Sequence, residues 1–289
     1  MAEASARNFP VVREMLGHAD AIYGFKSGFD RKGLALGLKA GGYWPGNVKR
    51  GLSNHQSTVF LFDPDTGKCQ AMIGGNLLTA LRTAAAAAVS VARLARTDSR
   101  VLGIVGAGHQ AAFQLRAVAE QRKFAKVLAW NRSIEKLDRL AAVARELGLE
   151  FSAVTRDALA AQCDVIITIT SSAEALLRVD QIRPGTHLSC MGTDTPGKLE
   201  VDPALVARAS LFTDERAQAI TIGECQHAVA QGLVAADAIT ELGQVIVGKH
   251  PGRRSADEIT LFDGTGVALQ DLAVAAAILQ RAKKPGQGH

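Results

Sequence analysis

A glycine turn between an apolar strand and a helix constrains this chain more than any other feature. The segment VLGIVGAGHQAAFQL begins at Val101 and places Gly106, Gly108 and Ala111 in a G-x-G-x-x-A pattern. The first glycine permits a tight turn, the second lets the backbone approach a pyrophosphate, and the alanine allows the helix to pack closely, with its N-terminus toward the phosphates. Because the pattern sits between a strand and a helix, it predicts a dinucleotide-binding domain.

Strands and helices alternate after Val101, and this alternation predicts the fold class. Segments such as KVLAWN and CDVIITIT are apolar throughout and are separated by helices, as in a parallel sheet covered on both faces. The residues before Val101 instead predict strands joined by tight turns and an Ala-rich helix over about 75–95. We therefore predict an α/β protein: a doubly wound Rossmann domain (residues 96–258) inserted into a discontinuous α+β domain (residues 1–95 and 259–289).

Composition and spacing exclude several classes of protein. The Ala-rich segment TAAAAAVSVARLAR is interrupted by serine and arginine, so we expect no membrane span, and the N-terminus lacks the pattern of a signal peptide, so we expect a cytoplasmic protein. The net charge of +5 is modest and lacks interleaved aromatic residues, which argues against nucleic-acid binding. The cysteines and histidines show no metal-ligand spacing, so we predict no metal. The positive charge favours small anionic partners.

The end of the next predicted strand bears on the choice of cofactor. An NAD site normally has an acidic residue there, whereas this chain has Asn131, Arg132 and Ser133. The guanidinium of Arg132 and the hydroxyl of Ser133 can hold a 2′-phosphate. We therefore predict NADPH, with NADH as the alternative. The alternative is that Arg132 is a solvent-facing arginine at the start of a helix.

Three charged residues stand among small or apolar neighbours and are candidates for substrate contact. They are Lys39 in LGLKAGG, Arg82 in LLTALRTAAAA and Asp194 in CMGTDTPGK. Each has a structural alternative: Lys39 can protect an edge strand, Arg82 can face solvent, and Asp194 can cap a turn.

Several long segments together resemble the ornithine cyclodeaminase and mu-crystallin family in order and spacing. They are LLTALRTAAAAAVSVARLAR, VLGIVGAGHQA, VLAWNRS, MGTDTPGKLEVDP, ELGQVIVGKHPGRRSADEITLF and GTGVALQDLA. The match covers nearly the whole chain. It implies a discontinuous substrate and dimerisation domain joined to a Rossmann domain, and hence a homodimer.

The resemblance implies roles for individual residues. Lys39 and Arg82 match residues that bind the substrate carboxylate, and Asp194 matches the acid of the G-x-D-x-P-G-K segment. The family's N-terminal arginine has no secure match, and Arg7 is the first candidate and Arg13 the second. The residues that we expect to contact the cofactor are Thr83, Gly106, Ala107, Gly108, His109, Gln110, Asn131, Arg132, Ser133, Thr170, Met191, Thr265 and Gly266.

The segments HQST and GGYWPGN are similar to the ketimine reductase branch, which reduces Δ1-pyrroline-2-carboxylate to L-proline or Δ1-piperideine-2-carboxylate to L-pipecolate. The resemblance thus implies hydride transfer from NADPH to the C=N carbon of a cyclic imino acid. Arg82 and Lys39 would bind the carboxylate, and Asp194 would stabilise the iminium or relay its proton. His55 is a candidate proton donor, with a structural histidine as the alternative. An ornithine cyclodeaminase that recycles NAD, or a non-catalytic protein that binds NADPH and a small ligand, remains an alternative function.

Overall fold

The computed structural model describes residues 6–8, 12–15, 18 and 20–283. Contacts divide the chain into two compact units. Unit 1 comprises Met1–Arg82 with Val267–His289, and unit 2 comprises Thr83–Gly266.

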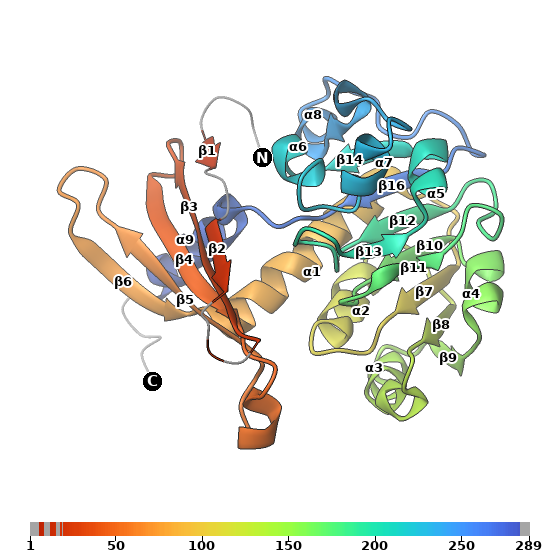
Figure 1. The fold of residues 1–289 in the computed structure, drawn as a ribbon, viewed down its shortest axis with the longest axis horizontal. Helices are drawn as coiled ribbons and strands as arrows, with labels where there is room; N and C mark the ends of the chain where they lie inside the picture. Colours follow the sequence, from red (N-terminus) through yellow and green to blue (C-terminus); the bar gives the residue numbers. More distant parts are fainter. Residues whose placement is uncertain (1–5, 9–11, 16–17, 19, 284–289) are drawn as a thin grey trace. The chain divides into compact units, whose positions relative to one another are not determined.

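Unit 1 is built on an antiparallel sheet in the order β1-β3-β4-β5-β6, with β2 also paired to β3 (Figure 1). Its strands are β1 (Ala6–Asn8), β2 (Val12–Met15), β3 (Ile22–Asp30), β4 (Ala35–Tyr43), β5 (His55–Phe62) and β6 (Cys69–Gly74), with the short helix η1 (Asn47–Arg50) between β4 and β5. The hairpin over Asp63–Gly67 forms as predicted, whereas β3 was not anticipated from the sequence.

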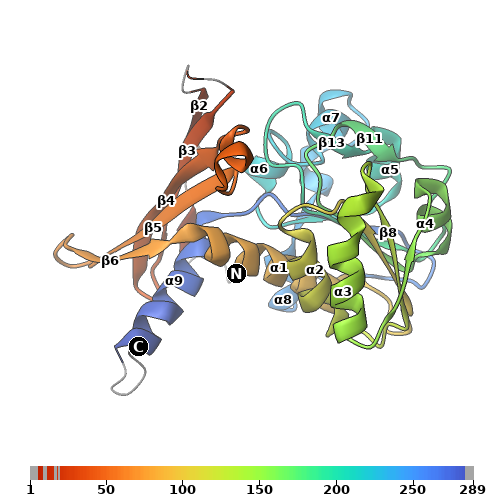
Figure 2. The same cartoon turned by 90° about the horizontal axis from the view of Figure 1, so that it is seen from below.

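One face of this sheet carries the core of unit 1. Helix α9 (Ala268–Ala282) packs on this face (Figure 2), as does the first part of α1 (Gly75–Leu94). The core residues are Ala35, Val59, Leu61, Leu78, Leu272 and Ala275. Gly37 is needed for this packing, because a Cβ atom there would lie 2.8 Å from Leu272 Cδ2 and 2.2 Å from the Phe60 carbonyl oxygen.

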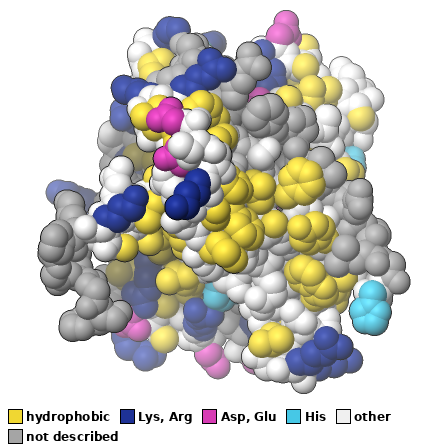
Figure 3. Space-filling view, turned by 90° about the vertical axis from the view of Figure 1, so that its left-hand side faces the viewer, with side chains coloured by type: hydrophobic (Ala, Val, Ile, Leu, Met, Phe, Trp, Pro, Cys, Tyr) yellow, Lys and Arg dark blue, Asp and Glu magenta, His cyan; other side chains and the backbone are white. Residues whose placement is uncertain are grey.

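The other face of the sheet is rich in apolar side chains, and we call it the apolar sheet face. Its residues follow from strand alternation and register, and they are Tyr23, Phe25, Phe29, Leu36, Leu38, Phe60, Phe62 and Met72. Tyr23, Phe25 and Met72 are 36%, 41% and 70% exposed. Figure 3 shows hydrophobic side chains gathered on this side of the molecule.

Unit 2 contains an eight-stranded sheet in the order β15-β14-β16-β12-β10-β7-β8-β9, and every neighbouring pair is parallel. The strands are β7 (Val101–Val105), β8 (Lys126–Trp130), β9 (Glu150–Ala153), β10 (Val165–Thr168), β12 (His187–Cys190), β14 (Ser210–Thr213), β15 (Thr240–Glu241) and β16 (Thr260–Asp263). A separate two-stranded parallel sheet joins β11 (Ala173–Leu177) to β13 (Leu199–Val201). The predicted doubly wound α/β fold is confirmed.

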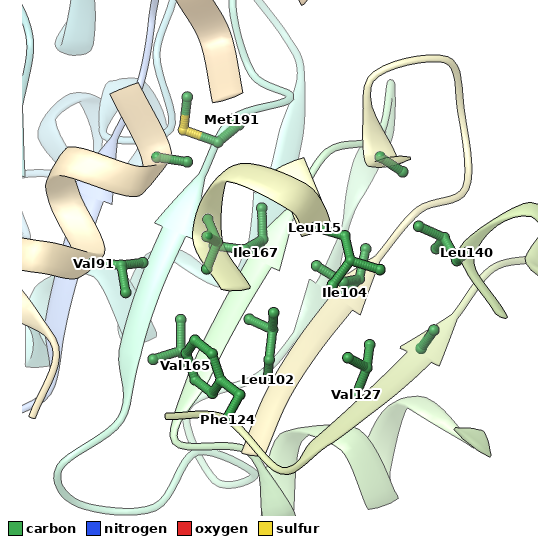
Figure 4. Packing of buried hydrophobic residues seen from close by; sticks show 14 of the residues in the cluster. Val91, Leu102, Ile104, Leu115, Phe124, Val127, Leu140, Val165, Ile167 and Met191 are labelled. Carbon is green, nitrogen blue, oxygen red and sulfur yellow. The ribbon is translucent and has the colours of Figure 1, made fainter. Parts of the chain in front are cut away.

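Helices cover both faces of the parallel sheet. They are α2 (Ala111–Ala119), η2 (Ile134–Leu137), α3 (Asp138–Glu146), α4 (Arg156–Gln162), α5 (Pro203–Arg208), α6 (Arg216–Ala219), α7 (Gln226–Ala230), η3 (Ala236–Ala238) and α8 (Leu242–Ile246). On one face, Val91 of α1, Leu115 of α2 and Leu140 of α3 pack against Ile104 and its neighbours (Figure 4). On the other face, Leu159 of α4 and the residues of α5 pack against alternate strand residues.

The unit boundaries differ from the predicted ones near residues 95 and 259. They lie between Arg82 and Thr83, within α1, and between Gly266 and Val267, before α9. Strand β16, predicted to begin the returning segment, instead pairs with β12 and β14 in the parallel sheet, and all four of its residues are buried. The predicted boundary near residue 95 was placed at the end of α1. In the structure this helix contributes residues to both units, so the boundary lies within it.

Helix α1 bears on the prediction that the chain lacks a membrane span. Its 20 residues are long and apolar enough to cross a bilayer by length and composition, with a mean hydropathy of 1.4 in an 18-residue window. However, 61% of that window is buried within the protein, and core helices of soluble proteins share these properties. A cytoplasmic location stays a prediction.

Candidate functional site

The predicted cofactor residues of unit 2 gather at one edge of the parallel sheet. Strand order reverses between β7 and β10, since β8 and β9 follow β7 on one side whereas β10, β12 and β16 lie on the other. Open parallel sheets bind ligands at the carboxyl ends of the strands beside such a switch point. The loops after β7, β8, β10, β12 and β16 all start from that edge.

The loop after β7 makes a tight turn and leaves open space before helix α2. Gly106 has a φ of 109°, and a Cβ atom there would lie 2.7 Å from the Ile169 carbonyl oxygen, so only glycine fits. A Cβ atom at Gly108 would meet no atom within 4 Å, and Gly108 and His109 are exposed. Open space therefore lies beside this loop just before helix α2, where backbone N–H groups favour an anion.

Asn131 fixes this loop against the end of β8. Its Oδ1 accepts a hydrogen bond from the Ala107 N–H (3.1 Å), and its Nδ2 donates to the Ser133 carbonyl (2.8 Å). Arg132 is exposed between them. Asn131 is thus a positioning residue for the phosphate loop, while Arg132 is placed at the surface beside it.

A cavity of about 600 Å³ lies at the ends of β8 and β9, where the sheet order places the adenosine half of a dinucleotide. Its lining residues are Trp130, Asn131, Ile134, Leu137, Ala153, Val154, Thr155, Arg156 and Asp157. The Arg156 guanidinium lies 5.1 Å from the centre of the Trp130 ring. The sequence prediction missed Arg156, because it sits beyond β9 and belongs to no recognised motif.

Buried glutamates hold the loops after β10 and β12. Glu200 accepts hydrogen bonds from Thr168 Oγ1 (2.7 Å), from the N–H and Oγ1 of Thr170 (2.6 and 2.7 Å) and from the Gly192 N–H (2.9 Å). Glu224 in turn accepts from the Thr193 hydroxyl and from the Glu200 N–H (2.8 Å). Both the backbone N–H and the hydroxyl of Thr170 are therefore hydrogen-bonded to Glu200.

Asp214 holds the loop after β16 in the same way. Its carboxylate accepts from the N–H and Oγ1 of Thr265 (3.1 and 2.7 Å) and from the N–H of Gly266 (2.7 Å). Met191, also predicted to contact the cofactor, is 6% exposed and belongs to the hydrophobic cluster of Figure 4. The structure thus places Met191 in the core beneath these loops.

Three buried carboxyl groups below these loops have raised pKa values. Burial, together with the neighbouring Glu200, raises the pKa of Glu224 to about 8. Burial also raises the pKa of Asp263 to about 7 and that of Glu200 above its ordinary value. Glu224 and Asp263 therefore retain protons at a pH at which exposed carboxyl groups are ionised.

The folding stability of unit 2 is expected to fall as the pH rises from about 5 to about 8. Glu224 and Asp263 stay protonated in the folded unit while they ionise in the unfolded chain, and each costs roughly 1.4 kcal/mol of stability per pH unit below its folded pKa. Glu224→Gln mimics the protonated form, so its unfolding free energy in urea should fall less steeply over this interval than that of the wild type. Glu150→Gln, at an exposed position, is the matched control. Equal slopes for all three proteins would refute the assignment.

Asp194 lies in the loop after β12, at the edge where the other loops gather. Its Oδ1 accepts from Lys198 Nζ (2.8 Å) and from Thr195 Oγ1 (3.1 Å). Lys198 Nζ also donates to the Gly192 carbonyl (3.2 Å). Lys198 is thus a cationic partner of the Asp194 carboxyl group at this edge of the sheet.

Unit 1 brings Lys39 and Arg82 together on a carboxylate that the sequence prediction missed. Lys39 Nζ lies 3.1 and 2.9 Å from the two carboxylate oxygens of Asp271, and Arg82 Nε lies 3.0 Å from Asp271 Oδ1. Arg82 Nη1 also donates to Gln270 Oε1 (3.2 Å), and Lys39 Nζ to Thr79 Oγ1 (3.4 Å). Burial alone would raise the pKa of Asp271, but Arg82 and Lys39 hold it below its ordinary value.

A further lysine joins this group. Lys26 of β3 is directly opposite Lys39 of β4, and the two side chains project from the same face of the sheet. Both lysines are buried, at 6% and 7% exposure. We call Lys26, Lys39 and Arg82, gathered around Asp271, the cation cluster.

Comparison with known protein families identifies the family of this chain. A family model described as the ornithine cyclodeaminase/mu-crystallin family matches residues 28–286. The chain belongs to this family. The resemblance seen in the sequence is thereby confirmed.

Members of the family include enzymes that are named for the reduction of imines. The chain is 61% identical over 286 residues to the iminosuccinate reductase of Paracoccus denitrificans, covering 99% of this chain and 89% of that protein. A crystal structure of that reductase in complex with NAD⁺ matches with a TM-score of 0.91 and 60% identity, over 96% of this chain and 87% of that one.

Two more distant members extend the range of activities. The Δ1-pyrroline-2-carboxylate reductase of Paracoccus denitrificans is 35% identical over 253 residues, covering 86% of this chain and 79% of that protein. A structure described as an archaeal alanine dehydrogenase dimer with bound NAD matches with a TM-score of 0.92 and 31% identity, over 99% of this chain and 88% of that one.

Of the remaining predicted residues, His55 lies away from the cation cluster. His55 lies in β5 on the same face as Lys39 but four residues further along the ladder, or about 13 Å. Arg7 pairs with Phe29 through the backbone of β1, and Arg13 lies in β2; the side chains of both lie outside the described part of the structure. Thr83 is buried in α1, as the first residue of unit 2.

Proposed function

We propose that this protein is an NAD(P)H-dependent reductase of 2-imino acids whose preferred substrate is an open-chain dicarboxylic imine such as iminosuccinate. The observation that carries the proposal is the cation cluster, found in a chain 61% identical to an iminosuccinate reductase. The cyclic imino acid expected from the sequence is a second candidate, supported by the 35% identity to a Δ1-pyrroline-2-carboxylate reductase.

Charge supports the dicarboxylic substrate. Among the described residues of unit 1, the buried charged side chains are three cations and one carboxylate. A substrate with two carboxylates complements such a group better than a cyclic imino acid with one, because buried charges require partners of opposite sign.

The chain's own residues divide the work of the reaction. Arg82 is held by Asp271 through Nε and by Gln270 through Nη1, which fixes the plane of its guanidinium for a substrate carboxylate. Lys39 supplies a second cation for the same substrate carboxylate. We assign to Asp194 the stabilisation of the protonated imine nitrogen, since its carboxyl group lies at the cofactor edge of unit 2. The nicotinamide, when bound, supplies the hydride to the C=N carbon.

The residues of unit 2 fit a nicotinamide dinucleotide. The open space beside Gly108, the loop held by Asn131 and the cavity beside Trp130 match its pyrophosphate and adenosine parts. We retain NADPH as the preferred cofactor because Arg132 is exposed beside Ser133 at the end of β8. The NAD⁺ bound to the related reductase makes NADH the competing choice.

Cofactor preference is expected to depend on Arg132. Arg132→Asp removes a guanidinium and adds a repelling carboxylate, so kcat/KM for NADPH should fall roughly 10- to 100-fold while that for NADH changes little. Arg139→Asp, at an exposed position in α3, is the matched control. Steady-state kinetics with both cofactors provide the measurement, and an unchanged NADPH/NADH ratio would exclude a 2′-phosphate contact.

One assay separates the proposed reaction from its alternatives. Oxaloacetate and ammonia form iminosuccinate in solution with loss of water, and its reduction to aspartate consumes one NAD(P)H and one proton. We expect loss of nicotinamide absorbance with this mixture at a higher kcat/KM than with Δ1-pyrroline-2-carboxylate. Preference for the cyclic imine would favour the second candidate. Ammonia release from ornithine without net NADH formation would identify a cyclodeaminase, and ligand binding without turnover would identify a binding protein.

We also propose that the protein is a homodimer that pairs through the apolar sheet face. This face includes the exposed Tyr23, Phe25 and Met72, and apolar patches of this kind are typical of subunit interfaces. The description of the related alanine dehydrogenase as a dimer supports the proposal. Light scattering should give the mass of two 30.4-kDa chains; the mass of one chain would refute it.

A further inference from the structure

Two side chains pair beside the cavity at the ends of β8 and β9. Trp130 is the last residue of β8, and Arg156 is the first residue of α4, whose start is capped by the Thr155 hydroxyl through a hydrogen bond from the Ala158 N–H (3.2 Å). Because β8 and β9 are parallel and in register, the chain that leaves β9 passes beside the end of β8. The Arg156 guanidinium carbon lies 5.1 Å from the centre of the Trp130 ring.

The pair remains accessible to a ligand. Both side chains are half-buried, so each keeps part of its surface open. A cation within about 6 Å of a ring centre is attracted by the π electrons, and a planar guanidinium can contact a ring with one face and a second planar group with the other. Asp157, the acid next to Arg156 in the chain, accepts a hydrogen bond from Gln181 Nε2. This acid therefore has a partner of its own.

The rest of the cavity favours a flat, uncharged ring over a phosphate. Ile134 and Leu137 of η2 line it, and Ile134 is 68% exposed although its side chain is large and apolar. In the described part of unit 2, the charged residues that line the cavity are Arg156 and Asp157, whereas Arg132 lies outside the lining. Apolar side chains beside a guanidinium that lies over an aromatic ring form a surface on which a purine can stack.

Resting on the dinucleotide binding of the proposed function, we propose that Arg156 contacts the adenine base of the nicotinamide cofactor, while the Trp130 ring holds the guanidinium in place. NADH and NADPH have the same base, so this contact contributes equally to the binding of both. Arg156 thus sets the affinity for the dinucleotide, and the choice between the two cofactors is left to Arg132. Removal of Arg156 should raise KM for both cofactors by the same factor with little change in kcat.

Equilibrium binding to the full chain tests the assignment without any reaction. Calorimetric titration compares 5′-AMP with 2′,5′-ADP, which has the same base and one further phosphate group. Arg156→Leu should weaken the binding of both nucleotides by the same factor, roughly 5- to 50-fold. Arg145→Leu, at an exposed position of α3, is the matched control and should bind both as the wild type does.

Three results would overturn the proposal. A selective loss of 2′,5′-ADP binding in Arg156→Leu would assign the guanidinium to the 2′-phosphate, and unchanged affinities would remove Arg156 from the site. Arg156→Lys keeps the charge but not the planar face, so it should recover little of the affinity for 5′-AMP. Full recovery by lysine would show a contact with a phosphate group instead of the base.

Steady-state kinetics separate this inference from the proposed function. In Arg156→Leu the KM values for NADH and NADPH should rise together, which leaves the ratio of the two activities unchanged, in contrast to Arg132→Asp. The nucleotide titrations involve no imine, so absence of turnover with every imino acid would refute the proposed reaction and leave their result intact. A wild-type protein that binds neither 5′-AMP nor 2′,5′-ADP would refute the adenine site itself.

Discussion

Replacing Arg82 with alanine is expected to reduce kcat/KM for the imino acid by roughly three orders of magnitude. The guanidinium is buried and is held in a fixed plane by Asp271 and Gln270, so its removal takes away an oriented cation and leaves the substrate carboxylate without a partner. The loss should appear in KM and kcat together, because the same carboxylate contact also orients the imine carbon. Steady-state kinetics over a wide substrate range provide the measurement.

Two comparisons make the Arg82 result specific. Arg93→Ala, at an exposed position of the same helix, should retain wild-type kinetics. Arg82→Lys keeps the charge but not the fork of donors, and it should recover part of the activity. An Arg82→Ala enzyme with wild-type substrate dependence would remove Arg82 from the site.

Replacing Asp271 with asparagine is expected to destabilise unit 1 by about 3–5 kcal/mol, because buried cations lose the carboxylate that compensates them. The pKa of Asp271 lies below its ordinary value, so this contribution is present at neutral pH. It should disappear only as the pH falls through that lowered pKa in strong acid. Asp65→Asn, at an exposed position of the β5–β6 turn, is the matched control.

The two tryptophans of the chain allow unit 1 to be followed separately. Trp44 belongs to unit 1 and Trp130 to unit 2. In a Trp130→Phe background, fluorescence in urea reports the surroundings of Trp44, and the Asp271→Asn transition should move to lower urea than that of the control. Coincident transitions would show that Asp271 contributes little to the stability of unit 1.

The fold of unit 2 could be predicted from the sequence because its signals are local. A buried parallel strand is an uninterrupted apolar run, and the turn at Gly106 is marked by the residue that its φ of 109° requires. The position of β16 was wrong for the opposite reason. Its partners, β12 and β14, are known only once the sheet order is known.

Only part of the cation cluster could be predicted from the sequence. Lys39 and Arg82 stood out as charges in apolar segments, but Asp271 is 232 and 189 residues away from them along the chain. No local pattern connects positions so distant. Lys26 did carry a signal, since its GFKSG repeats the GLKAG around Lys39, but the signal has meaning only when β3 and β4 are paired in this register.

The predicted cofactor residues fall into two groups: some are exposed, and others are held by hydrogen bonds to a carboxylate. Gly108 and Arg132 are exposed at the edge of the sheet, whereas Thr170 and Thr265 are held by the carboxylates of Glu200 and Asp214. Motif matching identifies the loop residues but not the acids beneath them. No role was predicted for these acids from the sequence.

Folding of unit 2 is also a proton-binding reaction. At neutral pH, Glu224 with its pKa of about 8 carries a proton in the folded unit and loses it when the unit unfolds and the group regains an ordinary pKa. Asp271 in unit 1, whose pKa is lowered, is ionised in both states and releases none. Unfolding of unit 2 therefore acidifies a weakly buffered solution, and its apparent calorimetric enthalpy includes the heat of protonating whichever buffer takes up the proton.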